Sequence, residues 1–273
     1  MNGKITIGQF YPADSYIHHL DPRTKIICTF VYLISLFLFN SIWTFAVATV
    51  FLALVITECK VPLGFILKGL KAVFILLIIT ALFNLFLTQG TVLVKFWIFK
   101  ITEEGIRNAV LMAVRLVYLV VGASVMTLST SPNALTDGTE KILRPLGKIK
   151  VPVHEIAMMM SIALRFIPIL VEETDKIMKA QKARGADIDT GTIIQKAKAM
   201  VPILVPLFVS AFRRANDLAM AMEARCYHGG DNRTRMKVLK YSGSDITAYI
   251  VTALYLACII LVGIFVKIPL WVF

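Results

Sequence analysis

The chain has 273 residues, 58% of them hydrophobic, and a formal net charge of +12. A mean hydropathy of +0.76 predicts an integral membrane protein and excludes a soluble domain with a large core. The positive charge does not indicate a nucleic-acid partner, because the cytoplasmic segments of membrane proteins collect Lys and Arg.

Residues that could carry metal, redox or nucleotide chemistry are scattered along the chain. The four cysteines have no Cys-x-x-Cys spacing, and the four histidines have no ligand-like neighbours. There is no phosphate-binding Gly-x-x-x-x-Gly-Lys-[Ser/Thr] loop, and the apolar segments hold no string of carboxylates. We therefore expect no catalytic residue, no metal site and no cofactor.

Residues 1–130 predict a membrane block with four spans. The first 25 residues are polar, with Asp14-Ser15 and Asp21-Pro22 as turn or helix-start signals. Arg23 and Lys25 stand before the first apolar run, which places the N-terminus inside the cell. The apolar runs predict membrane helices at 26–39, 42–57, 65–87 and 107–128.

Two features of this block have more than one interpretation. Residues 88–106 are aromatic and β-prone but too short to span, so we expect an interfacial hairpin or helix on the outer side. Trp97 and Phe99 would lie there at headgroup level. Arg115 falls inside the fourth span, where it either snorkels or bonds a neighbouring helix, or has a functional role.

From 131 to 241 the pattern changes to amphipathic helices with many charges. Between 133 and 241 there are 18 Lys and Arg against 11 Asp and Glu, which predicts a cytoplasmic location. Pro168 is expected to kink or break the second helix, and Pro202 and Pro206 to bend the third. The apolar stretch 199–212 fits a partner-binding or interfacial helix better than a span. The expected helices are 133–146, 152–184 and 194–226.

A final apolar run at 246–266 predicts a transmembrane helix within residues 242–273 and leaves the C-terminus outside. The predicted fold is an all-α membrane protein. It has about five transmembrane helices and a cytoplasmic block of long amphipathic helices.

Two near-duplicate stretches, 180–185 and 221–226, stand out in the charged block. Counting from three residues before each stretch, an apolar residue, a small residue and an arginine stand at positions i, i+3 and i+7, which share one face of a helix. These residues are Ile177, Ala180 and Arg184 in the first copy and Leu218, Ala221 and Arg225 in the second. An arginine in the last turn is common at helix ends, where it favours the dipole. The repetition of the whole face instead indicates two docking surfaces for another protein. The predicted docking residues are Ala183, Arg184, Gly185, Ala224, Arg225 and Cys226.

Methionines also gather in this block, which holds eight of the eleven in the chain. Methionine side chains adapt to several partners, although they also fill cores. We assign Met158, Met159 and Met160 as a candidate contact with a second, interchangeable partner.

The motifs together resemble the transmembrane T component of energy-coupling factor (ECF) transporters over nearly the whole chain. The resemblance rests on Asp21-Pro22-Arg23, on Leu164-Arg165-Phe166-Ile167-Pro168, and on the two Ala-Arg motifs. It implies that Arg184 and Arg225 insert into grooves of two ATP-binding cassette ATPase subunits. It also implies that the same helices hold a substrate-binding S component in the bilayer. Cys226 replaces the glycine of the family motif, and a positive φ there would be strained.

The predicted function is therefore that of a non-enzymatic coupling subunit of an ATP-driven importer for vitamins or other micronutrients in the bacterial cell membrane. The alternative is a self-contained secondary carrier or channel whose cytoplasmic helices are regulatory. A carrier would purify alone and transport without ATPase partners, whereas a coupling subunit would need them.

Overall fold

The computed structural model describes residues 10–38, 41–88, 90–96, 99–186, 192–229 and 239–265. Contacts between residues divide the chain into two compact units. One comprises residues 1–141 and 238–273, and the other comprises residues 142–237. The first unit is thus built from both ends of the chain.

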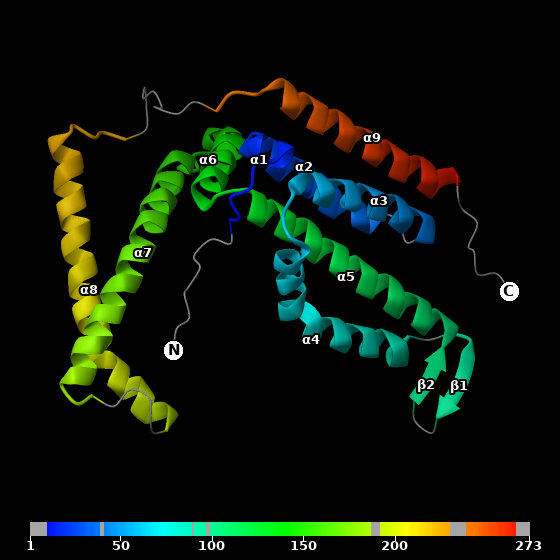
Figure 1. The fold of residues 1–273 in the computed structure, drawn as a ribbon, viewed down its shortest axis with the longest axis horizontal. Coiled ribbons are helices and arrows are strands. Elements are labelled where there is room, and N and C mark those ends of the chain that lie inside the picture. The colour runs from blue at the N-terminus through cyan, green and yellow to red at the C-terminus, as the bar shows by residue number, and fades with distance from the viewer. Residues whose placement is uncertain are drawn as a thin grey trace. The chain divides into compact units, whose positions relative to one another are not determined.

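The first unit is a helical bundle with one hairpin (Figure 1). The sequence signals for its first helices are confirmed: Ser15 caps α1 by accepting a hydrogen bond from the His18 amide, and α2 begins at Pro22. Every expected apolar run of this unit also forms a helix. The helices are α1 (Tyr16–His19), α2 (Pro22–Leu38), α3 (Ile42–Cys59), α4 (Leu63–Leu87), α5 (Glu103–Ser129), α6 (Pro132–Leu143), which runs into the second unit, and α9 (Gly243–Phe265).

The segment between α4 and α5 is a two-stranded antiparallel hairpin, the only exception to the helical class in the described ranges. Strand β1 (Val92–Phe96) pairs with β2 (Phe99–Thr102), with Lys95 opposite Lys100. Of the two alternatives left open by the sequence, the hairpin is therefore correct. The expected headgroup position of Trp97 lies outside the described residues, and that of Phe99 stays a prediction.

The core of the first unit lies between α2, α3, α5 and α9. The Tyr255 ring stacks on Phe51 with 4.1 Å between centroids, and Phe51 stacks on Tyr32 at 5.8 Å. The Tyr255 hydroxyl lies 2.8 Å from Ser35 Oγ, so both buried hydroxyls find a partner. Aliphatic side chains complete this core, among them Leu36, Ala48, Leu52, Val121, Val125 and Ile259.

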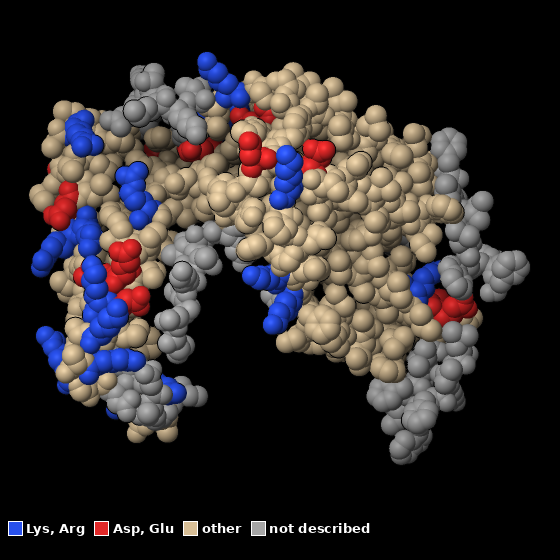
Figure 2. All heavy atoms as spheres, in the orientation of Figure 1, with Lys and Arg blue, Asp and Glu red and all other residues tan. Residues whose placement is uncertain are grey.

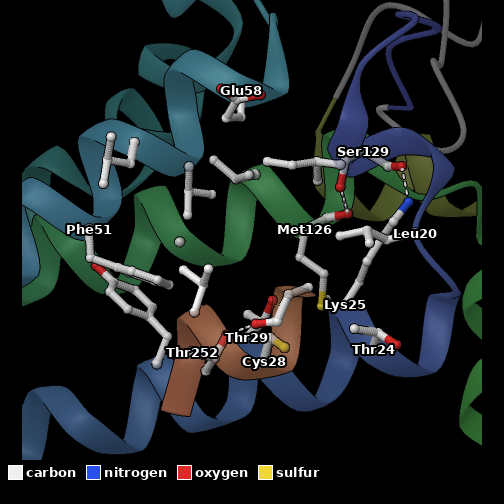
Figure 3. Close-up of a pocket in the computed structure, with 18 of the residues that line it drawn as sticks. Leu20, Thr24, Lys25, Cys28, Thr29, Phe51, Glu58, Met126, Ser129 and Thr252 are labelled. Carbon is white, nitrogen blue, oxygen red and sulfur yellow. Dashed lines mark hydrogen bonds between the residues drawn. The ribbon is translucent and has the colours of Figure 1, made fainter. Parts of the chain in front are cut away.

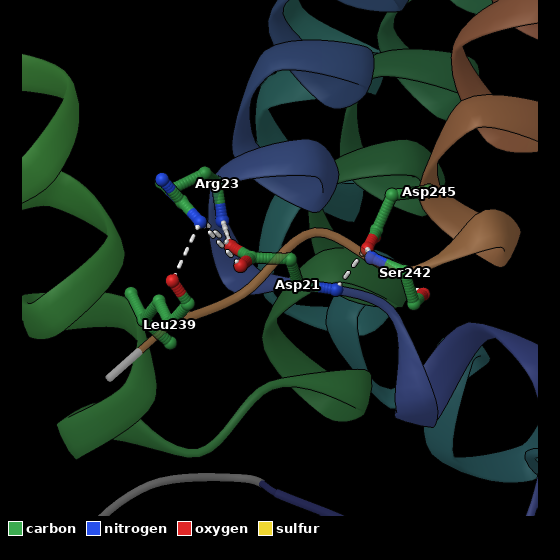
Figure 4. A network of polar contacts seen from close by, with 5 residues as sticks. All are labelled: Asp21, Arg23, Leu239, Ser242 and Asp245. Atoms are coloured by element: carbon green, nitrogen blue, oxygen red, sulfur yellow. Dashed lines mark hydrogen bonds and ion pairs between the residues drawn. The ribbon is translucent and has the colours of Figure 1, made fainter. Parts of the chain in front are cut away.

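A buried polar network joins the start of α2 to the start of α9 (Figure 4). The Asp245 carboxylate accepts hydrogen bonds from the Asp21 amide at 2.8 Å, the Ser242 amide at 2.8 Å and the Ser242 hydroxyl at 3.0 Å. Asp21 forms an ion pair of 2.8 Å with Arg23, which also donates to the carbonyl oxygen of Leu239 at 3.3 Å. The Asp-Pro-Arg motif therefore ties the N-terminal helices to the last helix.

Helix α6 lies directly against the same turn of α2. A Cβ added at Gly138 would come within 2.9 Å of the Pro22 Cβ, closer than real Cβ atoms approach, so this contact requires glycine. The chain thus leaves the first unit beside Pro22 and returns at Leu239, which Arg23 binds.

Within its described residues, the second unit contains a 3₁₀ turn (Arg144–Ile149) and two long helices, α7 (Val153–Ala183) and α8 (Ile193–Ala224). Helix α7 continues through Pro168, so the expected break does not occur, and the alternative of a kink at this position stays a prediction. One missing amide costs only one of the many backbone hydrogen bonds in a helix of 31 residues. Helix α8 changes direction in its first half, which contains Pro202 and Pro206 (Figure 1).

Five helices of the described chain are long and apolar enough to cross a membrane: α3, α5, α7, α8 and α9. Helix α4 adds a sixth as a bent pair, with 57° between Leu63–Lys71 and Val73–Leu87. The expected count of about five is confirmed, but the set differs, since α7 and α8 qualify and the 17-residue α2 does not.

Candidate partner-docking site

Helix α7 ends in a tightly bonded left-handed turn that presents Arg184. The Gly185 amide donates to the Lys182 carbonyl at 3.0 Å, and the Ala186 amide donates to the Gln181 carbonyl at 3.0 Å. Gly185 has φ of +86°. These two bonds and the positive φ define a Schellman motif, in which the loop backbone satisfies the last carbonyls of the helix.

Helix α8 ends in the same motif, 41 positions later in the sequence. The Cys226 amide donates to the Glu223 carbonyl at 2.8 Å, and the Tyr227 amide donates to the Met222 carbonyl at 3.0 Å. Cys226 has φ of +54°, so the left-handed position that holds glycine on α7 holds a residue with a side chain here. The strain expected for Cys226 is therefore present.

The predicted docking residues are all accessible. Ala183, Arg184 and Gly185 are exposed, and so are Ala224, Arg225 and Cys226. Ile177 and Leu218, which stand seven residues before Arg184 and Arg225, are both half-buried. The repeated face found in the sequence therefore exists as a repeated surface.

Neither arginine side chain has a hydrogen-bond or ion-pair partner within the ranges that the structure describes. Because the backbone already caps the last turn, the two guanidinium groups are not needed to satisfy carbonyls. Each presents five N–H donors in a fixed fork, which suits carboxylate or carbonyl oxygens of another protein.

The two motifs lie at opposite ends of an antiparallel helix pair. Gln181 of α7 donates to the Pro202 carbonyl of α8 at 3.2 Å, while Glu173 of α7 forms an ion pair of 3.3 Å with Arg214 of α8. Moving back along α7 therefore corresponds to moving forward along α8. The end of α7 at Arg184 therefore lies near Pro202 of α8, whereas the other motif lies at the far end of α8. The 19 residues from Pro206 to Arg225 span about 28 Å at 1.5 Å per residue, so the two motifs are at least about that far apart.

The ion pair between Glu173 of α7 and Arg214 of α8 was not predicted from the sequence. Arg214 is one of several basic residues on α8, and its partner lies 41 residues away on another helix. A pair of opposite charges three or four residues apart on one helix can be recognised in a sequence. The Glu173–Arg214 pair joins two helices, so it depends on how they cross.

The surface of the α7–α8 unit combines charge with exposed apolar side chains. On the face shown in Figure 2, Lys and Arg gather over α7 and α8, whereas the surface over α3, α4 and α5 is mostly uncharged. Met159 and Met160 are 58% and 51% exposed, and Met158 is half-buried. Helix α8 carries a further exposed apolar stripe formed by Val201, Val205, Phe208, Val209 and Phe212.

Arg115 is buried at 7% exposure in the middle of α5. Its guanidinium lies 5.3 Å from the centre of the Phe37 ring and 5.7 Å from that of Phe45. These cation–π contacts favour the packing interpretation of this residue. In the part of the chain that the structure covers, no group of three or more His, Cys, Asp or Glu could hold a metal ion.

The sequence of the chain matches those of known proteins. The model of the CbiQ family, described as a cobalt transport protein, matches residues 13–236. A curated relative from Clostridium kluyveri, an energy-coupling factor transporter transmembrane protein EcfT, is 57% identical over 257 residues, which are 93% of this chain and 95% of the relative. Proteins of the same name from Ruminiclostridium cellulolyticum and Bacillus subtilis are 50% identical (94% and 96% of the two chains) and 45% identical (95% and 98%).

The chain belongs to the CbiQ family of ECF transporter transmembrane proteins. The resemblance predicted from the sequence is thereby confirmed. As a member of this family, the chain is a multi-pass protein of the bacterial membrane and a transporter subunit rather than an enzyme in its own right. The family match includes both Ala-Arg motifs, while the roles of their individual residues stay a prediction.

Proposed function

We propose that this ECF transmembrane protein couples two ATP-binding cassette ATPase subunits to a membrane-embedded S component that carries a vitamin or another micronutrient. The observation that carries the proposal is the duplicated helix end. Two helices finish in the same Schellman motif, and each presents an arginine that is free of described partners.

The distance between the two ends supports two separate docking events. Ends that lie at least about 28 Å apart cannot both enter one groove of a small domain. They fit two lobes of a dimeric partner, and an ATPase pair is such a partner. Each arginine would be desolvated on docking, so its loss would cost more than that of an exposed charge.

The exposed apolar side chains of the same unit support the second partner. Met159 and Met160 on α7 and the α8 stripe leave a large apolar area uncovered, which monomeric soluble proteins rarely do. Such a surface has to meet lipid or protein. We assign Met158, Met159 and Met160 to contact with the S component, because flexible thioether side chains fit interchangeable partners.

Coupling would follow from the way the two helices hold each other. The ion pair of Glu173 with Arg214 and the bond of Gln181 with Pro202 fix where α7 crosses α8. When ATP closes the ATPase pair, the two docked ends would move toward each other and the helices would turn about this crossing. The apolar surface would turn with them and reorient the S component.

The test is a double charge reversal, Arg184→Glu with Arg225→Glu, in a complex co-expressed with both ATPases and the S component. Repulsion at both lobes should release the ATPases, while membrane insertion and S-component binding continue. The matched control is Lys179→Glu with Arg213→Glu, which makes the same charge change at exposed positions of the same helices.

Both ATPases should co-purify with the control variant at wild-type levels. If they also co-purify with the Arg184/Arg225 variant, the arginines are only helix-end residues and the proposed docking is wrong. Uptake by the protein reconstituted without any ATPase would support the carrier alternative instead.

A further inference from the structure

The first unit contains a cavity of about 440 Å³ between α1, α2, α3, α5 and α9 (Figure 3). This volume falls in the range of roughly 300–1,000 Å³ that is usual for small-molecule sites. Most of its walls are aliphatic or aromatic, and no part of the docking surface contributes to it. The cavity is therefore separate from the proposed docking residues on α7 and α8.

The polarity of the lining changes along the length of the cavity. Lys25, Glu58 and Ser129 line it near one end of the bundle, where α2 begins and where α3 and α5 end. Seven residues further into each helix, the lining residues are Tyr32, Phe51 and Gly122. Seven residues of α-helix span about 10.5 Å, so the cavity runs parallel to the helices for about two turns.

The rim includes residues that face outward from spanning helices. Leu54 of α3 and Val251 of α9 line the cavity, yet they are 58% and 54% exposed. Since these helices cross the membrane, an outward-facing leucine and valine meet acyl chains rather than water. The cavity is thus continuous with the lipid phase.

The polar end carries one cation and one anion. Lys25 is 7% exposed as a residue, and its ammonium donates to the carbonyl oxygens of His18 at 3.0 Å and Ser129 at 2.9 Å. An ammonium has three donors, so one remains after these two bonds, and no described carboxylate lies within ion-pair distance. Glu58 is exposed on the opposite wall.

We propose that this cavity binds one acyl chain of a zwitterionic phospholipid, with the headgroup at the end formed by Lys25 and Glu58. The phosphate complements the ammonium of Lys25, and the amine of the headgroup complements the carboxylate of Glu58. The chain extends past Met126 toward Phe51. With the predicted topology, the lipid comes from the cytoplasmic leaflet. This inference does not depend on the proposed ATPase docking.

The test uses the full-length protein in micelles of dodecyl maltoside, a detergent without a charged headgroup, that contain a trace of phosphatidylethanolamine with a diazirine in its acyl chain. After illumination, peptide mass spectrometry should find the probe on cavity residues such as Cys28 and Met126. Unlabelled phosphatidylethanolamine should compete, whereas phosphatidylglycerol should compete less, because it lacks the amine. Ala248→Phe fills the cavity and should lower this labelling by about tenfold.

The matched control is Ala253→Phe, on the outward face of the same helix, which should label as the wild type does. Should Ala248→Phe fail to fold, Val55→Phe fills the cavity from α3 instead. Labelling confined to outward-facing positions such as Phe30 and Ile34, or labelling of cavity residues that excess lipid does not reduce, would overturn the proposal. Equal competition by phosphatidylglycerol would overturn the assignment of the headgroup.

Discussion

The backbone amide of Asp21 donates to the carboxylate of Asp245 across 2.8 Å, although the two residues are 224 positions apart. The Asp245 side chain is almost fully buried, at 1% exposure of the residue, and it serves three donors. This one carboxylate therefore fixes the start of α9 against the start of α2.

Asp245→Ala should lower the free energy of unfolding by about 2–3 kcal/mol, because it leaves the amide of the buried Asp21 and the amide of Ser242 without their acceptor. Asp245→Asn is the control, since its remaining oxygen can still accept one bond and the loss should be smaller. Thermal unfolding in detergent measures both. An Ala variant as stable as the wild type would show that water replaces the carboxylate.

Gly185 and Cys226 both have a positive φ, so substitutions at the two positions should change the stability of the protein in opposite directions. Cys226→Gly removes a Cβ from a positive-φ position and should stabilise the protein by about 1 kcal/mol. Gly185→Cys introduces the same strain and should destabilise it by a similar amount. Thermal unfolding of both variants checks the signs, and ATPase co-purification should persist in each, since the backbone motif is retained.

Acid should destabilise the N-terminal segment through His18. Burial lowers the pKa of His18 below its ordinary value of 6.5, and this outweighs the opposing hydrogen bond to the Tyr11 carbonyl. Nearby Lys25 and His19 lower the pKa further, and Asp14 raises it. The unfolded chain then binds a proton more readily than the folded one, so stability is complete above pH 6.5 and falls as the pH drops through and below that value.

The melting temperature should therefore decrease between pH 7.5 and 5.5, and His18→Gln should reduce this decrease. His228→Gln, at an exposed histidine of the other unit, should leave it unchanged. An unaltered pH dependence in His18→Gln would assign the effect to other groups.

The predicted topology can be tested at the native Cys226, which is exposed. If the charged block is cytoplasmic, a membrane-impermeant maleimide should label Cys226 only after the cells are lysed. Thr91→Cys in a variant without Cys226 should be labelled in intact cells, because the hairpin is expected outside. Labelling of Cys226 in intact cells would place the end of α8 outside the cell and contradict the predicted cytoplasmic location.

Local sequence patterns predicted those features that depend on residues close together in the chain. The i, i+3, i+7 spacing predicted matching faces at Arg184 and Arg225, and the Asp-Pro and Asp-Ser pairs predicted where helices begin. Both are properties of one helical turn. The β-prone run after Gly90 likewise predicted a short element, and the hairpin was one of two stated alternatives.

Contacts between distant segments could not be predicted in the same way. Nothing in the sequence pairs Asp21 with Asp245 or Glu173 with Arg214, since each contact depends on how helices pack. The cavity between α2, α3, α5 and α9 depends on packing as well. Pro168 shows a different limit. Whether one proline ends a helix depends on how strongly the other residues of that helix stabilise it.

The contacts of Pro22 with Gly138 and of Arg23 with Leu239 have a consequence for how the protein could be dissected. The segment that leads into the α7–α8 unit lies beside Pro22, and the segment that leads out of it lies beside Arg23. Both segments therefore meet the same turn of α2. In topological terms that unit is a domain insertion, and a short glycine–serine linker could close the gap that its removal leaves. The deletion protein would retain the whole aromatic core around Tyr255 and the Asp245 network, and so it should fold as an independent membrane bundle.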